Sequence, residues 1–188
     1  MSRRPPAKPH PKVRILESAD RLFYEKGIRA VGVDGIAESA GVSKRTLYDY
    51  FPSKDHLIVA YLTRRMQPSR TSDAPPREQI LAAFERLERV LVTKTFRGCP
   101  FVKAVAELGE PTHPANEIAS AFKEQRRLWF RDLLERLGVS EPELLSLQLA
   151  ILLDGTLALG LVRGDATVAR GARAAAITLL DAATNTND

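Results

Sequence analysis

Hydrophobic positions along the chain recur at steps of three and four residues, the spacing of one face of an α-helix. The first stripe begins after Lys12 and ends at Gly27, and glycine is common just past helix C-termini. Shorter stripes cover 33–40 and surround Leu47, and a fourth begins after Pro52. No segment alternates for long enough to predict a strand. The pattern therefore predicts an all-α chain of about nine helices.

A break in this pattern divides the chain. The segment "QPSRTSDAPP" (67–76) is rich in proline and small polar residues, which is typical of a linker. We expect a DNA-binding domain over 12–66 and an effector-binding and dimerisation domain over 77–188. Residues 1–11 contain four prolines and are predicted to be a disordered basic arm. In the second domain, Ser140 and Glu143 have the spacing of a capping box and predict a helix start.

The charge of the chain is concentrated in its first third. Residues 1–66 hold 13 Lys and Arg against 7 Asp and Glu, whereas the remaining residues hold 15 against 16. A basic N-terminal domain is expected to meet a polyanion. The single cysteine excludes an intrachain disulfide and fits a reducing compartment. With no apolar leader, and with an apolar run (149–162) too short to span a bilayer, the chain is expected to be cytoplasmic, without a membrane partner.

The stretch "VDGIAESAGVSKRTLYDY" has the pattern of a helix-turn-helix, two short helices joined by a tight turn with glycine. In such motifs the second helix enters the major groove of DNA. With Leu47 facing inward, the outward residues suit three tasks: base or phosphate contacts from cations, a thymine-methyl or phosphate contact from threonine, and phosphate contacts from tyrosine hydroxyls. The candidate DNA-binding residues are Lys44, Arg45, Thr46, Tyr48, Asp49, Tyr50 and Lys54.

Several of these side chains also have a purely structural interpretation. Tyr50 and Phe51 can close the small core of the domain, and for Phe51 this interpretation is favoured. A cation pair on a short helix is commonly just solvated. Asp49 repels phosphate, so it either pairs with Arg45 four residues away or accepts from a cytosine amino group. The pairing with Arg45 is the favoured alternative.

The segment 15–62 resembles the DNA-binding domain of the TetR family of transcriptional repressors. The resemblance lies in "A-x-x-L-F-x-x-x-G", "I-A-x-x-A-G-V-S-x-x-T-L-Y-x-Y-F" and "S-K-x-x-L", found in this order over nearly fifty residues. It implies a dimeric repressor whose C-terminal helices bind a small molecule that releases DNA. Because a two-fold dimer presents two copies of its recognition helix, we expect the partner to be an inverted-repeat operator in double-stranded DNA. The resemblance also implies DNA contacts at six of the seven candidates, Asp49 excepted. Gly32 departs from the family, which usually has a Ser or Thr cap there. Arg45 and Asp49 are specific to this chain and are expected to set its operator preference.

The C-terminal helices are the predicted dimer interface. The run 149–162 is apolar on all sides, so its helix must be buried all round. Gly155, Gly160 and the alanine-rich face of 168–183 would let two helix pairs approach closely. The predicted interface residues are Leu149, Leu153, Leu157, Leu161, Ala172, Ala176 and Leu179. The alternative is that both helices only complete the core of their own chain.

Aromatic residues gather in the remaining C-terminal helices and are candidates for an effector cavity. Polar groups near them could orient a ligand. The predicted effector-binding residues are Phe84, Leu91, Phe96, Cys99, Phe101, Phe122, Trp129, Phe130 and Asp154. The alternative for the aromatic residues is plain core packing. The alternative for Asp154 is a structural role, in which it caps a neighbouring helix or pairs with an arginine. Cys99, beside Arg97, is either a redox sensor or an inert thiol.

Other classes of function find little support in the sequence. The three histidines lack metal-ligand spacing, and there is no nucleophile elbow, phosphate loop or dinucleotide fingerprint. We therefore expect no catalytic activity, metal or cofactor. Besides a redox-responsive repressor, the remaining alternative is an architectural DNA-binding protein without an effector.

Overall fold

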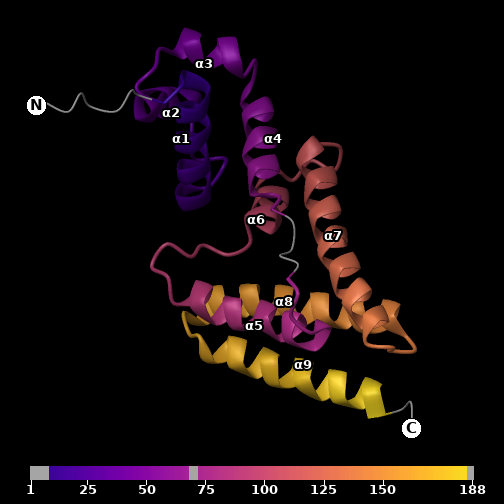
Figure 1. Cartoon of the computed structure of the whole chain (residues 1–188). Helices are drawn as coiled ribbons and strands as arrows, with labels where there is room; N and C mark the ends of the chain where they lie inside the picture. The colour runs from indigo at the N-terminus through magenta and orange to yellow at the C-terminus, as the bar shows by residue number, and fades with distance from the viewer. Residues whose placement is uncertain (1–8, 68–71, 186–188) are drawn as a thin grey trace, which may run out of the picture. The chain divides into compact units, whose positions relative to one another are not determined.

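The protein is described by a computed structural model that covers residues 9–67 and 72–185, and this part of the chain contains helices but no strands. Figure 1 shows the helices in chain order. Their bounds are α1 Pro11–Lys26, α2 Val33–Ala40, α3 Lys44–Tyr50, α4 Lys54–Arg65, α5 Pro76–Leu91, α6 Pro100–Leu108, α7 Pro114–Arg136, α8 Pro142–Arg163 and α9 Thr167–Asn185. The all-α prediction, with about nine helices, is confirmed for the described residues.

The chain forms two compact units. The first unit combines the residues up to Arg65 with Lys103–Ile118, and the second combines Met66–Val102 with the residues from Ala119 onward. The predicted domain 77–188 thus includes a segment, Lys103–Ile118, that packs with the first unit. Most of the predicted basic arm, residues 1–8, lies outside the described residues. Its end is already structured, because His10 caps α1 and Pro11 occupies the first helical position.

The first unit has a small apolar core to which all four N-terminal helices contribute. Ile15, Ile36, Leu47 and Leu57 are each fully buried there. The rings of Phe23 and Tyr61 meet edge-on, with centroids 5.5 Å apart, and the burial of that phenol raises its pKa. Phe51 ends α3 and is buried as well, which confirms its predicted structural role.

A partly buried ion pair joins α1 to α4. The Arg65 guanidinium donates from Nε and Nη2 to the two carboxylate oxygens of Asp20, at 2.6 and 2.9 Å. Its carbon also lies 4.2 Å from the centre of the Tyr24 ring. Two parallel charge-assisted bonds fix the angle between the helices more firmly than a single bond would.

We predict that Asp20→Asn lowers the free energy of unfolding of this unit by about 1–3 kcal/mol, because the half-buried guanidinium loses its matched acceptor. Glu25→Gln is the control, since Glu25 forms only an exposed pair with Arg21 at 3.8 Å. That change is expected to stay within about 0.5 kcal/mol. Urea unfolding of both variants measures the difference. Equal effects would mean that the Asp20 pair contributes no more than a surface contact.

In the second unit α5, α8 and α9 lie side by side and enclose an apolar core (Figure 1). Ridges of buried leucine and phenylalanine fill it, together with alanines of α9 that let the helices approach. The predicted interface residues Leu149, Leu153, Ala172 and Ala176 belong to this core. Leu149, Leu153 and Ala176 are buried within one chain and so offer no surface to a second copy, whereas Ala172 also lines the open groove between α8 and α9 and stays a predicted interface residue.

The remaining predicted interface residues differ in their exposure. Leu157 and Leu179 are partly buried against the same core. Leu161 is 45% exposed. Gly160 is also an intrachain contact, since a Cβ placed there would lie 2.6 Å from a methyl carbon of Leu91. Gly155 has nothing within 4 Å of such a Cβ and lies on the open side of α8.

The predicted burial of helix α8 on all sides would therefore need a second copy of the chain. Within the single chain α8 leaves apolar side chains in the open, among them Ile151 (61% exposed), Leu159 (49%) and Val162 (83%). It also starts later than the capping-box pattern indicated, with Glu141 at the N-cap and no side-chain capping bond.

By length and composition alone, α8 (22 residues) could cross a membrane, contrary to the prediction from the shorter run 149–162. Core helices of water-soluble proteins meet the same criterion, and one third of the most apolar window of α8 is buried inside this chain. Asp154, at its middle, is paired with two cations of α7. Such a charge cluster suits a helix packed against protein more than one facing lipid.

Candidate functional site

The turn between α2 and α3 is fixed by local backbone chemistry. Gly41 follows α2 in the left-handed conformation, with φ of 63°, where a side chain would be strained. Ser43 then caps α3, and its hydroxyl accepts from the Thr46 amide at 3.0 Å. Arg14 of α1 supports the turn by donating to the Ala40 carbonyl at 2.9 Å. At the other end of α2, Gly32 is the N-cap without a side-chain bond, as the sequence predicted.

Helix α3 buries a single side chain and presents the rest. Among its seven residues, only Leu47 is buried. Lys44, Arg45, Tyr48 and Asp49 are exposed, while Thr46 and Tyr50 are half-buried. The structure thus places six predicted DNA-binding residues on one short helix, with the seventh, Lys54, half-buried at the first position of α4. Helix α3 presents exposed cations and a tyrosine hydroxyl to solvent. Such groups suit contacts to phosphates and base edges.

The charges on this surface are arranged differently from the predicted pairing. Lys44 Nζ lies 2.8 Å from a carboxylate oxygen of Asp34 on α2. The hydrogen bond to Asp34 and the charge of that carboxylate raise the pKa of the Lys44 ammonium. In the described part of the chain, Arg45 and Asp49 form no ion pair with each other, so the favoured structural role of Asp49 is not observed. Both side chains are left to face a partner.

We predict that Asp34→Asn tightens binding to any duplex several-fold, because it frees the Lys44 ammonium for phosphate and removes a repelling charge. The measurement is fluorescence anisotropy with an unselected duplex at two salt concentrations. In the Lys44→Ala background, Asp34→Asn should increase the affinity for DNA much less. If the gain is the same in both backgrounds, Asp34 acts only through its own charge and not through the ion pair.

Tyr50 is held by a contact that the sequence pattern did not indicate. Its hydroxyl lies 3.4 Å from His10 Nε2, and the two rings meet edge-on with centroids 5.4 Å apart. The residues just before α1 are thereby attached to the end of α3. Tyr50 would therefore have to contact DNA through a hydroxyl that already lies beside His10, whereas Tyr48 is 40% exposed and has no such neighbour among the described contacts.

The second unit contains a cavity of about 340 Å³ among α5, α7 and α8. Of the predicted effector-binding residues, Phe122 and Trp129 line it; the full lining is Gln67, Ala83, Arg86, Leu87, Val90, Phe122, Arg126, Trp129, Leu153 and Leu157. A cavity with aromatic and leucine walls and a few polar groups is typical of a small-molecule site.

The other predicted apolar residues do not line this cavity. Phe84, Leu91, Phe96 and Phe130 belong to the packed core, which is the plain structural alternative. Phe101 is buried as well and stacks on Phe122, with ring centroids 4.0 Å apart. It therefore backs one wall of the cavity without lining it.

Asp154 lies at the centre of a charge cluster beside the cavity. Lys123 Nζ donates to its Oδ1 at 2.5 Å, and Arg126 Nη1 to the same oxygen at 3.2 Å. The predicted arginine pair is confirmed, and a lysine joins it. Lys123 Nζ also lies 3.6 Å from Cys99 Sγ. Burial lowers the pKa of the Arg126 guanidinium, although the charge of Asp154 works against that shift.

The open side of α8 and α9 forms a shallow apolar groove of about 530 Å³. Ile151, Gly155 and Leu159 recur every four residues along α8, and Gly171 and Ala175 do so along α9. Small residues on one helix beside large apolar residues on the other suit close packing with a second surface. Among the described residues, no group of three or more His, Cys, Asp or Glu could hold a metal ion.

Comparison with known proteins gives a consistent result. Residues 15–61 match the family model for bacterial regulatory proteins of the tetR family. A crystal structure of a putative TetR transcriptional regulator from Streptomyces avermitilis is 35% identical, with a TM-score of 0.79, over 93% of this chain and 98% of that one.

Two curated relatives match part of the chain. An HTH-type transcriptional regulator of Mycobacterium tuberculosis is 38% identical over 82 residues, which cover 44% of this chain and 39% of that protein. The HTH-type transcriptional repressor KstR of Rhodococcus jostii is 36% identical over 93 residues, which cover 47% of this chain and 42% of that protein. The chain thus spans less than half the length of both relatives.

Proposed function

The chain belongs to the TetR family of bacterial regulatory proteins, and from that membership we propose that it is a dimeric repressor that leaves its operator when a small molecule binds the second unit. It is a DNA-binding transcriptional regulator. The observation that supports the finer proposal most is the pairing of an exposed basic α3 in one unit with an aromatic-walled cavity in the other. Such a regulator acts where bacterial DNA lies, so we place it in the cytoplasm.

The DNA-binding surface that we propose is α3 with the start of α4. Lys44 and Arg45 supply charge, Tyr48 a phenol donor, and Lys54 a cation at a helix N-terminus, where phosphate is favoured. A two-fold dimer presents two copies of this surface to successive major-groove faces. The operator is therefore expected to be an inverted repeat.

Helix α6 is the element that we propose links ligand binding to DNA release. Its first turn belongs to the second unit, where Phe101 stacks on the cavity residue Phe122. Its later turns belong to the first unit, where Lys103 Nζ donates to the Tyr24 carbonyl at 2.9 Å and Glu107 accepts from the Arg29 amide at 3.1 Å. A ligand acts only if it binds the DNA-incompetent state more tightly. A shift of α6 is a direct way to favour that state.

Selection of bound fragments from a random duplex library tests this function. We expect the purified protein to enrich one inverted repeat, with two half-sites about one helical turn apart. An architectural protein would instead retain many unrelated sequences with similar affinity. Such a result would contradict the proposal of an operator-specific repressor.

A redox response through Cys99 is the second candidate, because reactive cysteines lie in partly exposed, electropositive surroundings, and Cys99 is partly exposed with Lys123 Nζ 3.6 Å from its Sγ. We predict that Cys99→Ser leaves operator binding and ligand response unchanged, since Cys99 does not line the cavity of about 340 Å³. Operator binding is measured with and without hydrogen peroxide in both proteins. Release of only the cysteine-containing protein by peroxide would favour the redox alternative.

A further inference from the structure

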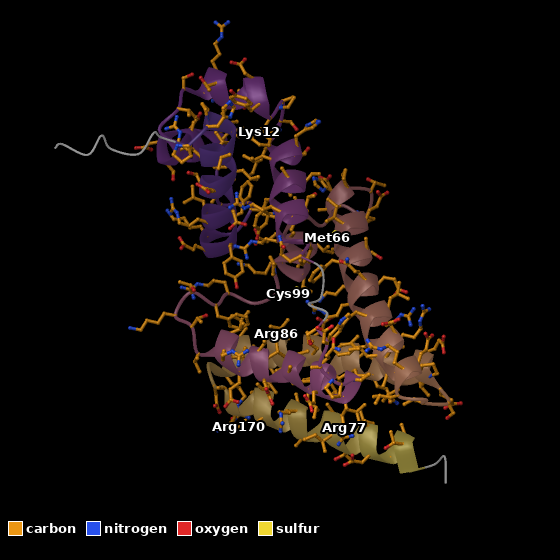
Figure 2. All side chains as sticks on the ribbon, viewed as in Figure 1. Lys12, Met66, Arg77, Arg86, Cys99 and Arg170 are labelled. Carbon is orange, nitrogen blue, oxygen red and sulfur yellow. The ribbon has the colours of Figure 1, made fainter. Side chains whose placement is uncertain are left out.

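Basic side chains line the cavity among α5, α7 and α8. The described residues that line it include two arginines, Arg86 on α5 and Arg126 on α7, and no acidic side chain (Figure 2 labels Arg86). Asp154 is the nearby carboxylate, but it is shared between Lys123 at 2.5 Å and Arg126 at 3.2 Å. This three-residue cluster keeps one net positive charge. A cationic ligand would find no acidic partner on these walls.

One polar group on the cavity wall, the indole N–H of Trp129, lacks a partner among the described residues. Trp129 lines the cavity, and its indole Nε1 is buried without a hydrogen-bond acceptor among the described residues. A buried donor without an acceptor is costly, and a ligand oxygen would satisfy it. Apart from Gln67 and the two arginines, the rest of the lining is apolar and includes Leu87, Leu153, Leu157 and Phe122. Arg126 is itself partly desolvated, with its guanidinium carbon 4.7 Å from the centre of the Phe122 ring.

We propose that this cavity binds an amphipathic monoanion, a carboxylic acid in its ionised form, with the carboxylate held by Arg126 and the Trp129 indole N–H and the apolar tail among the leucines. This inference rests on the proposed function and specifies the chemical class of its effector. The carboxylate is the planar acceptor that a guanidinium binds best. A volume of about 340 Å³ has room for roughly eleven groups of the size of a water molecule.

Octanoate is a suitable probe, because its chain length fits this volume. Two matched probes change only the head group: 1-octanol has no charge, and octylammonium has the opposite charge. Trp129 is the single tryptophan of the chain, so its fluorescence reports binding to the full-length protein without DNA. We expect octanoate to cause a saturable change and to bind about tenfold or more tightly than 1-octanol, with octylammonium weaker than both.

Three variants test the two proposed contacts. Arg126→Gln is expected to weaken octanoate binding about tenfold or more while leaving 1-octanol binding unchanged, and Arg126→Lys should restore part of the loss. Trp129→Phe, followed by calorimetry, should weaken octanoate several-fold through loss of the N–H donor. Arg131→Gln is the control, since Arg131 lies on the same helix, pairs with Glu135 and does not line the cavity. If Arg126→Gln does not fold, Arg126→Lys and Trp129→Phe still test whether these two residues bind the carboxylate.

Three results would overturn the proposal: 1-octanol binding as tightly as octanoate, no saturable response to any probe, or octanoate affinity independent of both Arg126 and Trp129. Operator binding is measured separately in the same samples. Octanoate that binds as expected but does not release the operator would contradict the ligand-released repressor and leave the cavity chemistry supported. Specific operator binding without any octanoate binding would contradict the cavity chemistry and leave the DNA-binding function intact.

Discussion

Replacing Ile151 with glutamate is expected to turn a dimeric protein into a monomer and to remove its affinity for an inverted-repeat operator. Ile151 is 61% exposed in the single chain and lines the α8–α9 groove. Gly155 and Leu159 continue the same stripe of α8, and Gly171 and Ala175 lie opposite on α9. An apolar stripe of this length on a water-exposed face indicates an interface.

The size of the effect follows from two-fold symmetry. In an interface between two identical chains the same position occurs twice, so one substitution buries two carboxylates. Each unpaired charge costs at least about 2 kcal/mol in an apolar contact, and together they raise the dimer dissociation constant by roughly three orders of magnitude. A monomer binds a single half-site. It therefore loses the gain that two linked half-sites provide.

Sedimentation equilibrium at micromolar concentration measures the change, with operator binding followed in parallel. Val92→Glu is the matched control, because Val92 is a comparably exposed apolar residue (66%) that does not line this groove. It is expected to leave the dimer intact. A stable wild-type monomer, or an Ile151→Glu protein that remains dimeric, would place the interface elsewhere.

The first unit could be predicted closely from the sequence because its signals are local. Gly41 and Ser43 determine the turn within three residues, and Leu47 alone sets the inward side of α3. Contacts between separate helices left no such signal. The Asp34–Lys44 pair joins residues ten positions apart, and the predicted neighbour pair of Arg45 and Asp49 did not form.

The second unit was predicted less well, and α8 shows why. Its apolar residues surround the helix, so hydrophobic spacing cannot distinguish the side that meets the core from the side that meets a partner. Leu149 and Leu153 face the core, whereas Ile151, between them in sequence, lies in the open. The lining of the cavity was hard to predict for a similar reason. Its aromatic walls could be guessed from composition, but Arg126 reaches Asp154 from 28 residues away.

The most informative test of the DNA-binding surface compares Arg45→Ala with Lys54→Ala over a panel of operator variants. Arg45 is exposed on the outward side of α3 and pairs with no acid among the described residues, which leaves its guanidinium available to a base edge. We expect Arg45→Ala to cost on the order of 1–3 kcal/mol per half-site. For two half-sites this corresponds to roughly 30-fold weaker binding or more. Preference at one base position in each half-site should relax.

Lys54→Ala should behave differently, because a cation at a helix start meets phosphate and carries no sequence information. It is expected to weaken all operator variants alike and to lower the slope of log K against log salt by about one per subunit. Lys26→Ala, an exposed lysine at the far end of α1, controls for the loss of charge and should change neither profile. Fluorescence anisotropy over the panel at several salt concentrations separates the two effects. If Arg45→Ala and Lys54→Ala give identical profiles, the outward face of α3 does not read bases, and sequence preference must come from DNA shape instead.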